Sequence, residues 1–271
     1  MKKIESEELK KIQYDILLYI KEVCEKHHIK YFIAFGTLIG AVRHQGFSPW
    51  DDDIDVVLLR EDYERLAEVM KHEQHEYYHF CDMRNMERCH GPYAIMEDKR
   101  TCVFHERFDQ ELLKNEGVSV DIFPLDDVPD DTKELKRLLK YQKFWKACNN
   151  LRISVEFSDK DTAFKKRVKK ITKSFVDVMG KEKIYSGFNK VLEQQPEGES
   201  HLVADLMCAP QLNNCYRKEL FQETVELKFE DDYFPAPKNY DEFLRTYYGD
   251  YMILPPEEER VSLHGYDYYW R

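Results

Sequence analysis

The chain lacks the features of an exported or membrane-spanning protein. Its first eight residues, MKKIESEE, contain no apolar stretch that could form a signal peptide, and no later apolar run approaches the roughly 20 residues that cross a bilayer. Its seven cysteines are an odd number without regular spacing, so they predict reduced thiols and not a disulfide framework. We therefore expect a cytoplasmic protein.

Internal repeats and low-complexity linkers are also missing. The 271 residues supply enough apolar material for one elaborated domain, or for a domain with a helical subdomain. A group of cysteines and histidines within residues 79–105 matches no common zinc module, so we interpret it as strand and loop residues. The group comprises His79, Cys81, Cys89, His90, Cys102 and His105.

The most informative segment is an acidic cluster that runs directly into an apolar β-branched stretch. Residues 50–59 read WDDDIDVVLL. Carboxylates this close repel one another by roughly 1 kcal/mol or more per near pair, so we expect a cation among them. In a strand that begins at Asp53, side chains alternate, and Asp53 and Asp55 share one face while Asp52 lies on the other. Such a pair suits a hard, oxygen-preferring cation, Mg²⁺ or Mn²⁺.

The acidic cluster has two other interpretations, a solvated loop and a calcium loop. A run of charge is often simply a solvated loop. A calcium loop that starts at Asp51 needs glycine at its sixth position and glutamate at its twelfth, where this chain has Val56 and Asp62. The following VVLL run also favours a strand over a loop. The pattern therefore disfavours calcium.

The segment before the acids predicts a phosphate-binding turn. Residues 31–35 have the pattern of a short buried strand, Gly36 provides a turn, Thr37 can cap a helix, and 38–44 form that helix. A helix N-terminus presents free backbone N–H groups and a positive dipole end, which suit a phosphate. Phosphate and Mg²⁺ are used together, so the two neighbouring signals indicate phosphoryl-type transfer.

A third acid stands in an alternating strand. Residues 118–126 read VSVDIFPLD, which turns Asp121 to the face opposite Val118 and Val120. A carboxylate within an apolar strand is rarely left unpaired. Asp121 is therefore either half of a structural salt bridge, a further metal ligand beside Asp53 and Asp55, or the base that takes a proton from an attacking hydroxyl.

These segments resemble a known family. AFGTLIGAVRHQGFSPWDDDID at 34–55, DIFPLD at 121–126 and YYGDYMILPP at 247–256 are similar to three landmarks of the LicD family, the bacterial phosphocholine transferases related to fukutin and fukutin-related protein. The three segments span most of the chain. The resemblance implies an α+β nucleotidyltransferase fold of the DNA polymerase β-like superfamily, a small mixed sheet flanked by helices.

Carried over to this chain, the resemblance implies roles for individual residues. Gly36 and Thr37 match the glycine–hydroxyl pair of the superfamily, and Asp53, Asp55 and Asp121 match its metal-binding and catalytic acids. It also implies a CDP-alcohol donor, CDP-choline first, an Mg²⁺ or Mn²⁺ cofactor and release of CMP. The implied acceptor is a glycan or lipid-linked precursor in lipopolysaccharide or teichoic acid biosynthesis.

Further substrate contacts are predicted around these acids. Arg43 steadies a phosphate or forms a salt bridge at the rim of the core, and Trp50 stacks on a base, faces a quaternary ammonium or only packs. Arg260 and His264, which follow the Leu-Pro-Pro turn, close the site from the C-terminal side. Two rival functions remain: a glycosyltransferase that uses an Asp-x-Asp motif and a nucleotide sugar, and a non-catalytic nucleotide-binding protein of this fold.

Patterning divides the chain into a catalytic core at 1–131, a basic helical subdomain at 132–195 and a C-terminal extension at 196–271 that packs back on the core. We expect helices over 5–28, 62–72 and 239–248, helical breaks near Ser158 and at Gly180, and a proline-rich turn at 235–237. The expected strands are 77–81, 93–96, 101–104, 118–126 and 225–229.

Charge is unevenly distributed. Residues 133–190 carry 17 Lys or Arg against 6 Asp or Glu, a balance of +11 in a chain of net charge −11, so the remaining residues sum to −22. Such a surface is either an ordinary solvated face or attracts an anionic partner, the inner membrane surface or a phosphate-rich acceptor. No recognition motif supports nucleic acid. The prediction is a cytoplasmic enzyme, peripheral at the membrane if the second interpretation holds.

Overall fold

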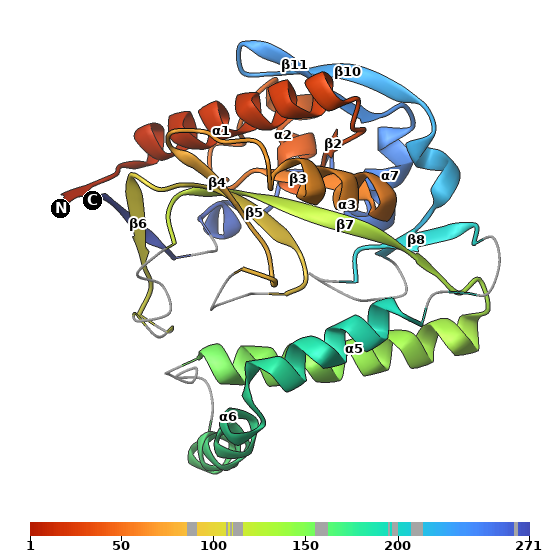
Figure 1. Ribbon diagram of the computed structural model, residues 1–271. Helices are drawn as coiled ribbons and strands as arrows, with labels where there is room; N and C mark the ends of the chain where they lie inside the picture. Colours follow the sequence, from red (N-terminus) through yellow and green to blue (C-terminus); the bar gives the residue numbers. More distant parts are fainter. Residues whose placement is uncertain are drawn as a thin grey trace.

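The computed structural model describes residues 1–85, 91–106, 108, 110, 116–154, 162–194, 196, 200–206, 214–262 and 265–271. A curled mixed sheet runs through the middle of the molecule, α1 crosses one side of it, and α5 and α6 gather on the other (Figure 1). The described α-helices are α1 (Ser6–His27), α2 (Phe35–His44), α3 (Arg60–Val69), α5 (Thr132–Ile153), α6 (Ala163–Leu192) and α7 (Tyr240–Tyr248). Two short 3₁₀ helices are η2 (Lys218–Phe221) and η3 (Glu257–Glu259).

The strands belong to three sheets. The largest has the order β2-β3-β7-β5-β4, and β8 joins β9 to the far end of β7. A second sheet has the order β1-β12-β6, and β10 pairs with β11 in the third. The strands are β1 (Lys2–Lys3), β2 (Phe32–Ile33), β3 (Asp55–Leu59), β4 (Tyr78–Cys81), β5 (Ala94–Asp98), β6 (Thr101–Phe104), β7 (Ser119–Val128), β8 (Leu202–Ala204), β9 (Cys215–Arg217), β10 (Thr224–Phe229), β11 (Asp232–Pro237) and β12 (Asp267–Trp270). The predicted α+β class with a mixed sheet is confirmed.

The parallel pair β3–β7 positions the site. It is the one parallel pair among the described strands, and its register sets Asp55 beside Asp121 and Leu59 beside Leu125. Val56, Val57 and Leu58 on β3 are buried, as expected for a central strand covered on both faces. Two acids far apart in sequence thus become direct neighbours at the same end of adjacent strands.

α1, the helix predicted over 5–28, covers the sheet with an apolar stripe. Ile16 and Ile20 are fully buried, and full burial of such a side chain stabilises a fold by roughly 1.5–3 kcal/mol. The other members of the stripe, Leu9, Ile12 and Val23, are also buried. Gln13 is buried among them at 1% exposure, which marks it as a polar residue with a specific partner.

A buried ion pair joins α3 to β7. The Arg60 guanidinium at the start of α3 donates from Nε to Asp126 Oδ1 at 2.7 Å and from Nη2 to Oδ2 at 2.9 Å. Asp126 is 1% exposed, so removing either partner leaves an uncompensated charge inside the protein. The second aspartate of the DIFPLD segment is therefore structural, and α3 begins two residues earlier than predicted because Arg60 must reach it.

Two predictions for the C-terminal third were wrong or incomplete. Residues 235–237 do not form a turn but lie in β11, where Pro235 pairs with Glu226 of β10. Proline is tolerated because both strands of a two-stranded hairpin are edges. The aromatic tail, which had no assigned structure, forms β12 between β1 and β6, with Trp270 opposite Lys2 and Thr101.

The basic segment is helical where it is described, as predicted. α6 is interrupted at Gly180, whose φ of 73° and ψ of 166° are not helical. After this break α6 packs on α5 so closely that a Cβ at Gly187 would lie 2.2 Å from the Trp145 ring. The break expected near Ser158 lies outside the described residues. Among the described helices, none has both the length and the hydropathy needed to cross a bilayer.

Candidate active site

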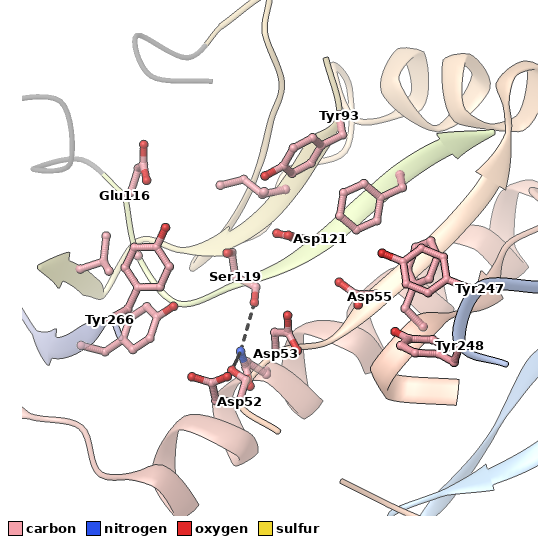
Figure 2. A pocket seen from close by; sticks show the side chains of 17 residues that line it. Asp52, Asp53, Asp55, Tyr93, Glu116, Ser119, Asp121, Tyr247, Tyr248 and Tyr266 are labelled. Carbon is pink, nitrogen blue, oxygen red and sulfur yellow. Dashed lines mark hydrogen bonds between the residues drawn. The ribbon is translucent and has the colours of Figure 1, made fainter. Parts of the chain in front are cut away.

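Three predicted acids line one cavity. Asp55 opens β3, Asp121 lies beside it on β7, and Asp53 precedes the strand by two residues. Together with Asp52 they border a cavity of 360 Å³ at the end of the parallel pair. Figure 2 shows Asp52, Asp53, Asp55 and Asp121 between Tyr266 on one side and Tyr93, Tyr247 and Tyr248 on the other. The strand begins at Asp55 and not at Asp53 as predicted. Asp52 therefore does not point to the opposite face of a strand, and it also lines the cavity.

The negative charges of these acids repel one another. Asp55 is 8% exposed. Burial, followed by the charges of Asp53 and Asp121, raises the pKa of Asp55 well above its ordinary value of 3.8. Oxygens of Asp51, Asp52 and Asp53 also lie within 4.8 Å of one another. The cavity therefore concentrates carboxylate oxygens, the ligands that Mg²⁺ prefers.

The helix before the acids differs from the prediction. α2 begins at Phe35 with Ala34 at its N-cap, so Thr37 lies inside the helix and is not its cap. The Thr37 hydroxyl instead accepts a hydrogen bond from the backbone N–H of Asp55 at 2.9 Å. Thr37 is buried at 2% exposure, and its role is to hold the first residue of β3 in place. The threonine hydroxyl therefore bonds to the neighbouring strand and not to the N-terminus of its own helix.

Gly36 is required by a close approach. A Cβ at this position would lie 2.6 Å from Asp51 Oδ2, so the start of α2 and the Asp51 carboxylate touch. A helix N-terminus favours an anionic group, and Asp51 is such a group. The Gly-Thr turn and the acidic cluster are thus one structural unit.

Gln13 ties the acidic loop to β7, which the sequence analysis missed. Its Nε2 donates to the carbonyl oxygen of Asp52 at 2.9 Å and to that of Ser119 at 3.5 Å. Both contacts join α1 to the chain segments that carry the acids. The polar residue at an apolar position of the helical stripe was the available signal.

The rest of the cavity wall is aromatic. Phe35 lies 5.9 Å from Phe123 and 5.1 Å from Tyr247, measured between ring centroids. Tyr93 lies 4.7 Å from Phe123. Tyr248, Tyr266 and Tyr268 complete the aromatic lining. Sequence reasoning missed these residues, because 18 tyrosines are scattered along the chain and those that meet here come from loops, β12 and the end of α7.

A second, larger cavity of 950 Å³ adjoins the first and shares Asp52 and Tyr248 with it. Gly36, Arg43 and Trp50 line this second cavity. The Arg43 guanidinium donates to the carbonyl oxygen of Tyr251 at 2.8 Å, which joins α2 to the YYGDYMILPP segment. This bond is to a backbone carbonyl oxygen, so it is not the predicted salt bridge. The predicted phosphate contact of Arg43 stays a prediction.

Trp50 lies between two arginines. The guanidinium carbons of Arg43 and Arg260 are each 5.7 Å from the centre of its ring. Arg260 also donates from Nε to the carbonyl oxygen of Pro255 at 2.9 Å. The structure thus brings Arg43, Trp50 and Arg260 together. His264 lies outside the described residues.

The chain is similar in sequence to known proteins. A sequence model described as "LicD/FKTN/FKRP, nucleotidyltransferase domain" matches residues 28–144, which include α2, β3 and β7. Over 272 aligned residues the chain is 30% identical to the lipopolysaccharide cholinephosphotransferase LicD of Haemophilus influenzae, with 97% of each protein covered.

Two rickettsial proteins match shorter stretches. An uncharacterized protein of Rickettsia prowazekii, RP689, is 44% identical over 57 residues, 21% of each chain. An uncharacterized protein of Rickettsia typhi, RT0683, is 35% identical over 107 residues, 36% of this chain and 32% of the relative.

Proposed function

Because this chain belongs to the LicD family, a family of enzymes whose Haemophilus relative is a cholinephosphotransferase, we propose that it transfers phosphocholine from CDP-choline to a cell-surface glycan such as lipopolysaccharide. The products are the phosphocholine-bearing glycan and CMP. The observation that carries the proposal is the group of Asp53, Asp55 and Asp121 in one cavity, beside a wall of aromatic rings.

The residues present fit a divalent cation. Asp55 is buried beside two other carboxylates, and such a cluster is stabilised when a cation neutralises it. Asp53 and Asp55 would hold Mg²⁺, with Asp121 as a further ligand or as the base. Bound there, Mg²⁺ supplies charge neutralisation for the diphosphate of the donor.

The chain's own groups then act on the acceptor. The acceptor hydroxyl oxygen forms a bond to the phosphorus that carries choline, and the bond from that phosphorus to the oxygen of CMP breaks. Asp121 is suited to accept the hydroxyl proton, because its carboxylate faces the cavity (Figure 2). Most of the rate enhancement comes from positioning and charge neutralisation.

The aromatic wall suits a quaternary ammonium. A cation over the face of a tyrosine or phenylalanine ring gains about 0.5–2 kcal/mol. Figure 2 shows Tyr93, Tyr247 and Tyr248 on one side of the cavity and Tyr266 on another, with carboxylates between them, and Tyr268 also lines the cavity. This lining favours choline over the uncharged glycerol and ribitol as the transferred alcohol.

The larger cavity is suited to the nucleotide. Trp50 offers a flat ring for a base, and Arg43 and Arg260 contribute positive charge beside it. The diphosphate would then lie between this cavity and the acids, near Gly36. Since Asp51 touches Gly36, the phosphates reach the start of α2 only with a cation between the two anionic groups. A nucleotide in the larger cavity with a cation at the neighbouring acids supports the assignment of the fold to the DNA polymerase β-like nucleotidyltransferase superfamily.

The test is CMP release from a panel of CDP-choline, CDP-ethanolamine, CDP-glycerol and CDP-ribitol, with Mg²⁺ or with EDTA and with lipopolysaccharide or teichoic-acid precursors as acceptors. We expect Mg²⁺-dependent release from CDP-choline. Release from a nucleotide sugar alone would favour a glycosyltransferase, and full activity in EDTA would leave the acids with a structural role.

A further inference from the structure

The first half of α6 exposes an apolar stripe that is unusual for a water-facing helix. The exposed fractions are 76% for Phe164, 72% for Phe175 and 89% for Val178. Val168 and Ile171, which are 45% and 53% exposed, lie between them. The five positions are spaced by three or four residues, so they form one face of the helix. We call Phe164, Val168, Ile171, Phe175 and Val178 the α6 stripe.

The opposite face of α6 is held by the protein. Val176 is buried, and the Lys173 ammonium donates to the carbonyl oxygens of Leu151 and Arg152 at the end of α5. In Figure 1 this part of α6 lies at the far edge of the molecule, away from the sheet. The α6 stripe therefore points outward and does not complete the core.

Basic residues accompany the α6 stripe. Residues 163–179 contain six Lys or Arg and one Asp, a balance of +5. A helix with an apolar face and lysines on its polar side is suited to lie in the interface of an anionic bilayer. Pairing two copies of this face would bring their cations together, which argues against a second copy as the occupant. We propose that the α6 stripe docks the enzyme on an anionic lipid bilayer.

This proposal is independent of the transferase reaction and can be tested separately. Co-sedimentation of the full chain with vesicles of phosphatidylcholine, with and without phosphatidylglycerol, should show binding to the anionic vesicles. Phe164→Gln with Phe175→Gln should weaken that binding by about tenfold or more, because apolar contact adds to charge attraction. Tyr233→Gln, which changes a 55% exposed aromatic residue on β11, is the matched control and should bind normally.

Each other outcome contradicts the proposal. Unchanged binding of the double variant would mean that charge alone, without the apolar stripe, attaches the protein to the vesicles. Equal binding to neutral vesicles would mean that the protein does not recognise an anionic surface. Absence of vesicle binding, or a dimer in sedimentation velocity that the double variant dissociates, would assign the stripe to another partner. CMP release with a water-soluble acceptor should be the same for all these variants.

A second, separate observation concerns the β4–β5 hairpin. His79 and Cys81 alternate onto one face of β4, and Glu97 lies opposite His79 on β5. His79 Nδ1 is 3.3 Å from Cys81 Sγ, which is 3.3 Å from Glu97 Oε1, and the Nδ1 to Oε1 distance is 3.7 Å. Three ligand atoms of different chemistry thus form a compact triangle.

The size of this triangle matches a tetrahedral metal. Zn²⁺ bonds of about 2.0 Å to nitrogen or oxygen and about 2.3 Å to sulfur set neighbouring ligand atoms roughly 3.3–3.6 Å apart. Glu97 is oriented from behind, because its Oε2 accepts a hydrogen bond from the Gly117 N–H at 3.2 Å. Such outer contacts are typical of metal-binding carboxylates. The thiolate and imidazole select Zn²⁺ over Mg²⁺.

The geometry points to a Zn²⁺ site formed by His79, Cys81 and Glu97. Of the six cysteines and histidines clustered in the sequence, His79 and Cys81 belong to it and Cys89 and His90 lie outside the described residues. Cys102 is elsewhere, with its Sγ 3.5 Å from Met1 Sδ. Because Gly117 also lines the smaller cavity, Zn²⁺ would brace the hairpin against the wall of the active site.

Cobalt substitution provides a readout that does not depend on transfer activity. Chelator-treated, reduced full-length protein should bind Co²⁺ with a thiolate charge-transfer absorption that Zn²⁺ removes. Cys81→Ser should abolish this absorption, and His79→Asn, at an exposed side chain, should weaken Co²⁺ binding by roughly tenfold or more. Cys102→Ser and Asp53→Asn should retain it. Absorption that persists in Cys81→Ser, or is absent from the unmodified chain, would overturn the assignment.

Discussion

The cavity at the end of β3 and the first half of α6 use charge in opposite ways. Around the cavity, acids from two strands are packed together, and Asp55 is buried at 8% exposure. On α6, six basic residues of the segment 163–179 surround apolar side chains that face the solvent. The chain's net charge of −11 combines these two unlike regions with the rest of the sequence and describes neither.

The difference separates chemistry from docking. Buried charges interact in a low dielectric and are screened little by salt, whereas exposed charges are screened within about 8 Å at physiological ionic strength. The acids should therefore govern catalysis under all salt conditions, and the basic helix should govern attachment in a salt-dependent way.

The largest effect is expected from the acids. Asp53→Asn and Asp55→Asn should each reduce CMP release from CDP-choline by at least about a hundredfold, because removing a charge that stabilises the transition state has effects of that size. Asp121→Ala should also lose activity. Melting temperatures should be unchanged or higher, since the apo cavity loses repulsion. Unchanged turnover in the Asp53 or Asp55 variant would contradict the cation assignment.

Asp127→Asn is the control for these variants. Asp127 lies on the same strand as Asp121, but it pairs with Lys218 at 2.7 Å and does not line the active-site cavity. Loss of an exposed ion pair costs about 0–1 kcal/mol of stability, so turnover should be retained. A large loss of turnover in this variant would show that carboxylates anywhere on β7 affect the reaction.

The next effect compares two glycines. Gly36→Ala should lower turnover roughly tenfold, because its Cβ would meet Asp51 Oδ2 at 2.6 Å and either α2 or the acid must move. At Gly180 nothing lies within 4 Å of an added Cβ, and the cost is that of backbone angles that glycine alone adopts readily, about 1–3 kcal/mol. Gly180→Ala should lower the melting temperature and leave turnover with a water-soluble acceptor intact. Equal turnover of the two variants would contradict this comparison.

The acidic half of the site was predictable from sequence, whereas its walls were not. The WDDDID motif identified Asp53 and Asp55, and strand periodicity identified Asp121, because both are local properties of the chain. The position of Asp55 beside Asp121 depends on strand register, which local patterns do not determine. The tyrosines come from loops, from the end of α7 and from β12, whose pairing with β6 joins residues more than 160 positions apart.

Local patterns failed where tertiary contacts took precedence. Thr37 had the composition of a helix cap, but its hydroxyl holds the Asp55 N–H. Pro235 had the composition of a turn, but the hairpin leaves its missing N–H without consequence. The positive charge of α6 is evident in the sequence. The exposure of its apolar stripe is not, because it depends on the burial of Val176 and on the bonds from Lys173 to the end of α5.

The pH dependence of stability tests the buried acid directly. The folded-state pKa of Asp55 is raised above its ordinary value of 3.8. Between pH 3.8 and this raised pKa, the folded metal-free protein therefore binds more protons than the unfolded chain. Stability from this group is therefore present below about pH 4 and is lost as pH rises through the raised pKa. The melting temperature of Asp55→Asn should exceed that of the unmodified chain by a margin that grows from pH 4 to pH 8. Added Mg²⁺ should reduce this margin, and a constant margin would mean that Asp55 is not strained.

The smallest effect is the most direct measure of the contrast between the two regions. Raising the ionic strength from 0.05 M to 0.5 M shortens the screening length from about 14 Å to about 4 Å, which weakens exposed charges and leaves contacts inside the cavity largely unaltered. Turnover with CDP-choline and a water-soluble acceptor should then change by less than about twofold. Binding to anionic vesicles over the same range should fall steeply, and reversing Lys165, Lys166, Lys169 and Lys170 to glutamate should remove the salt dependence. Parallel titrations of turnover and vesicle binding distinguish the two regions, because a shared salt dependence would mean that the basic helix also attracts the donor.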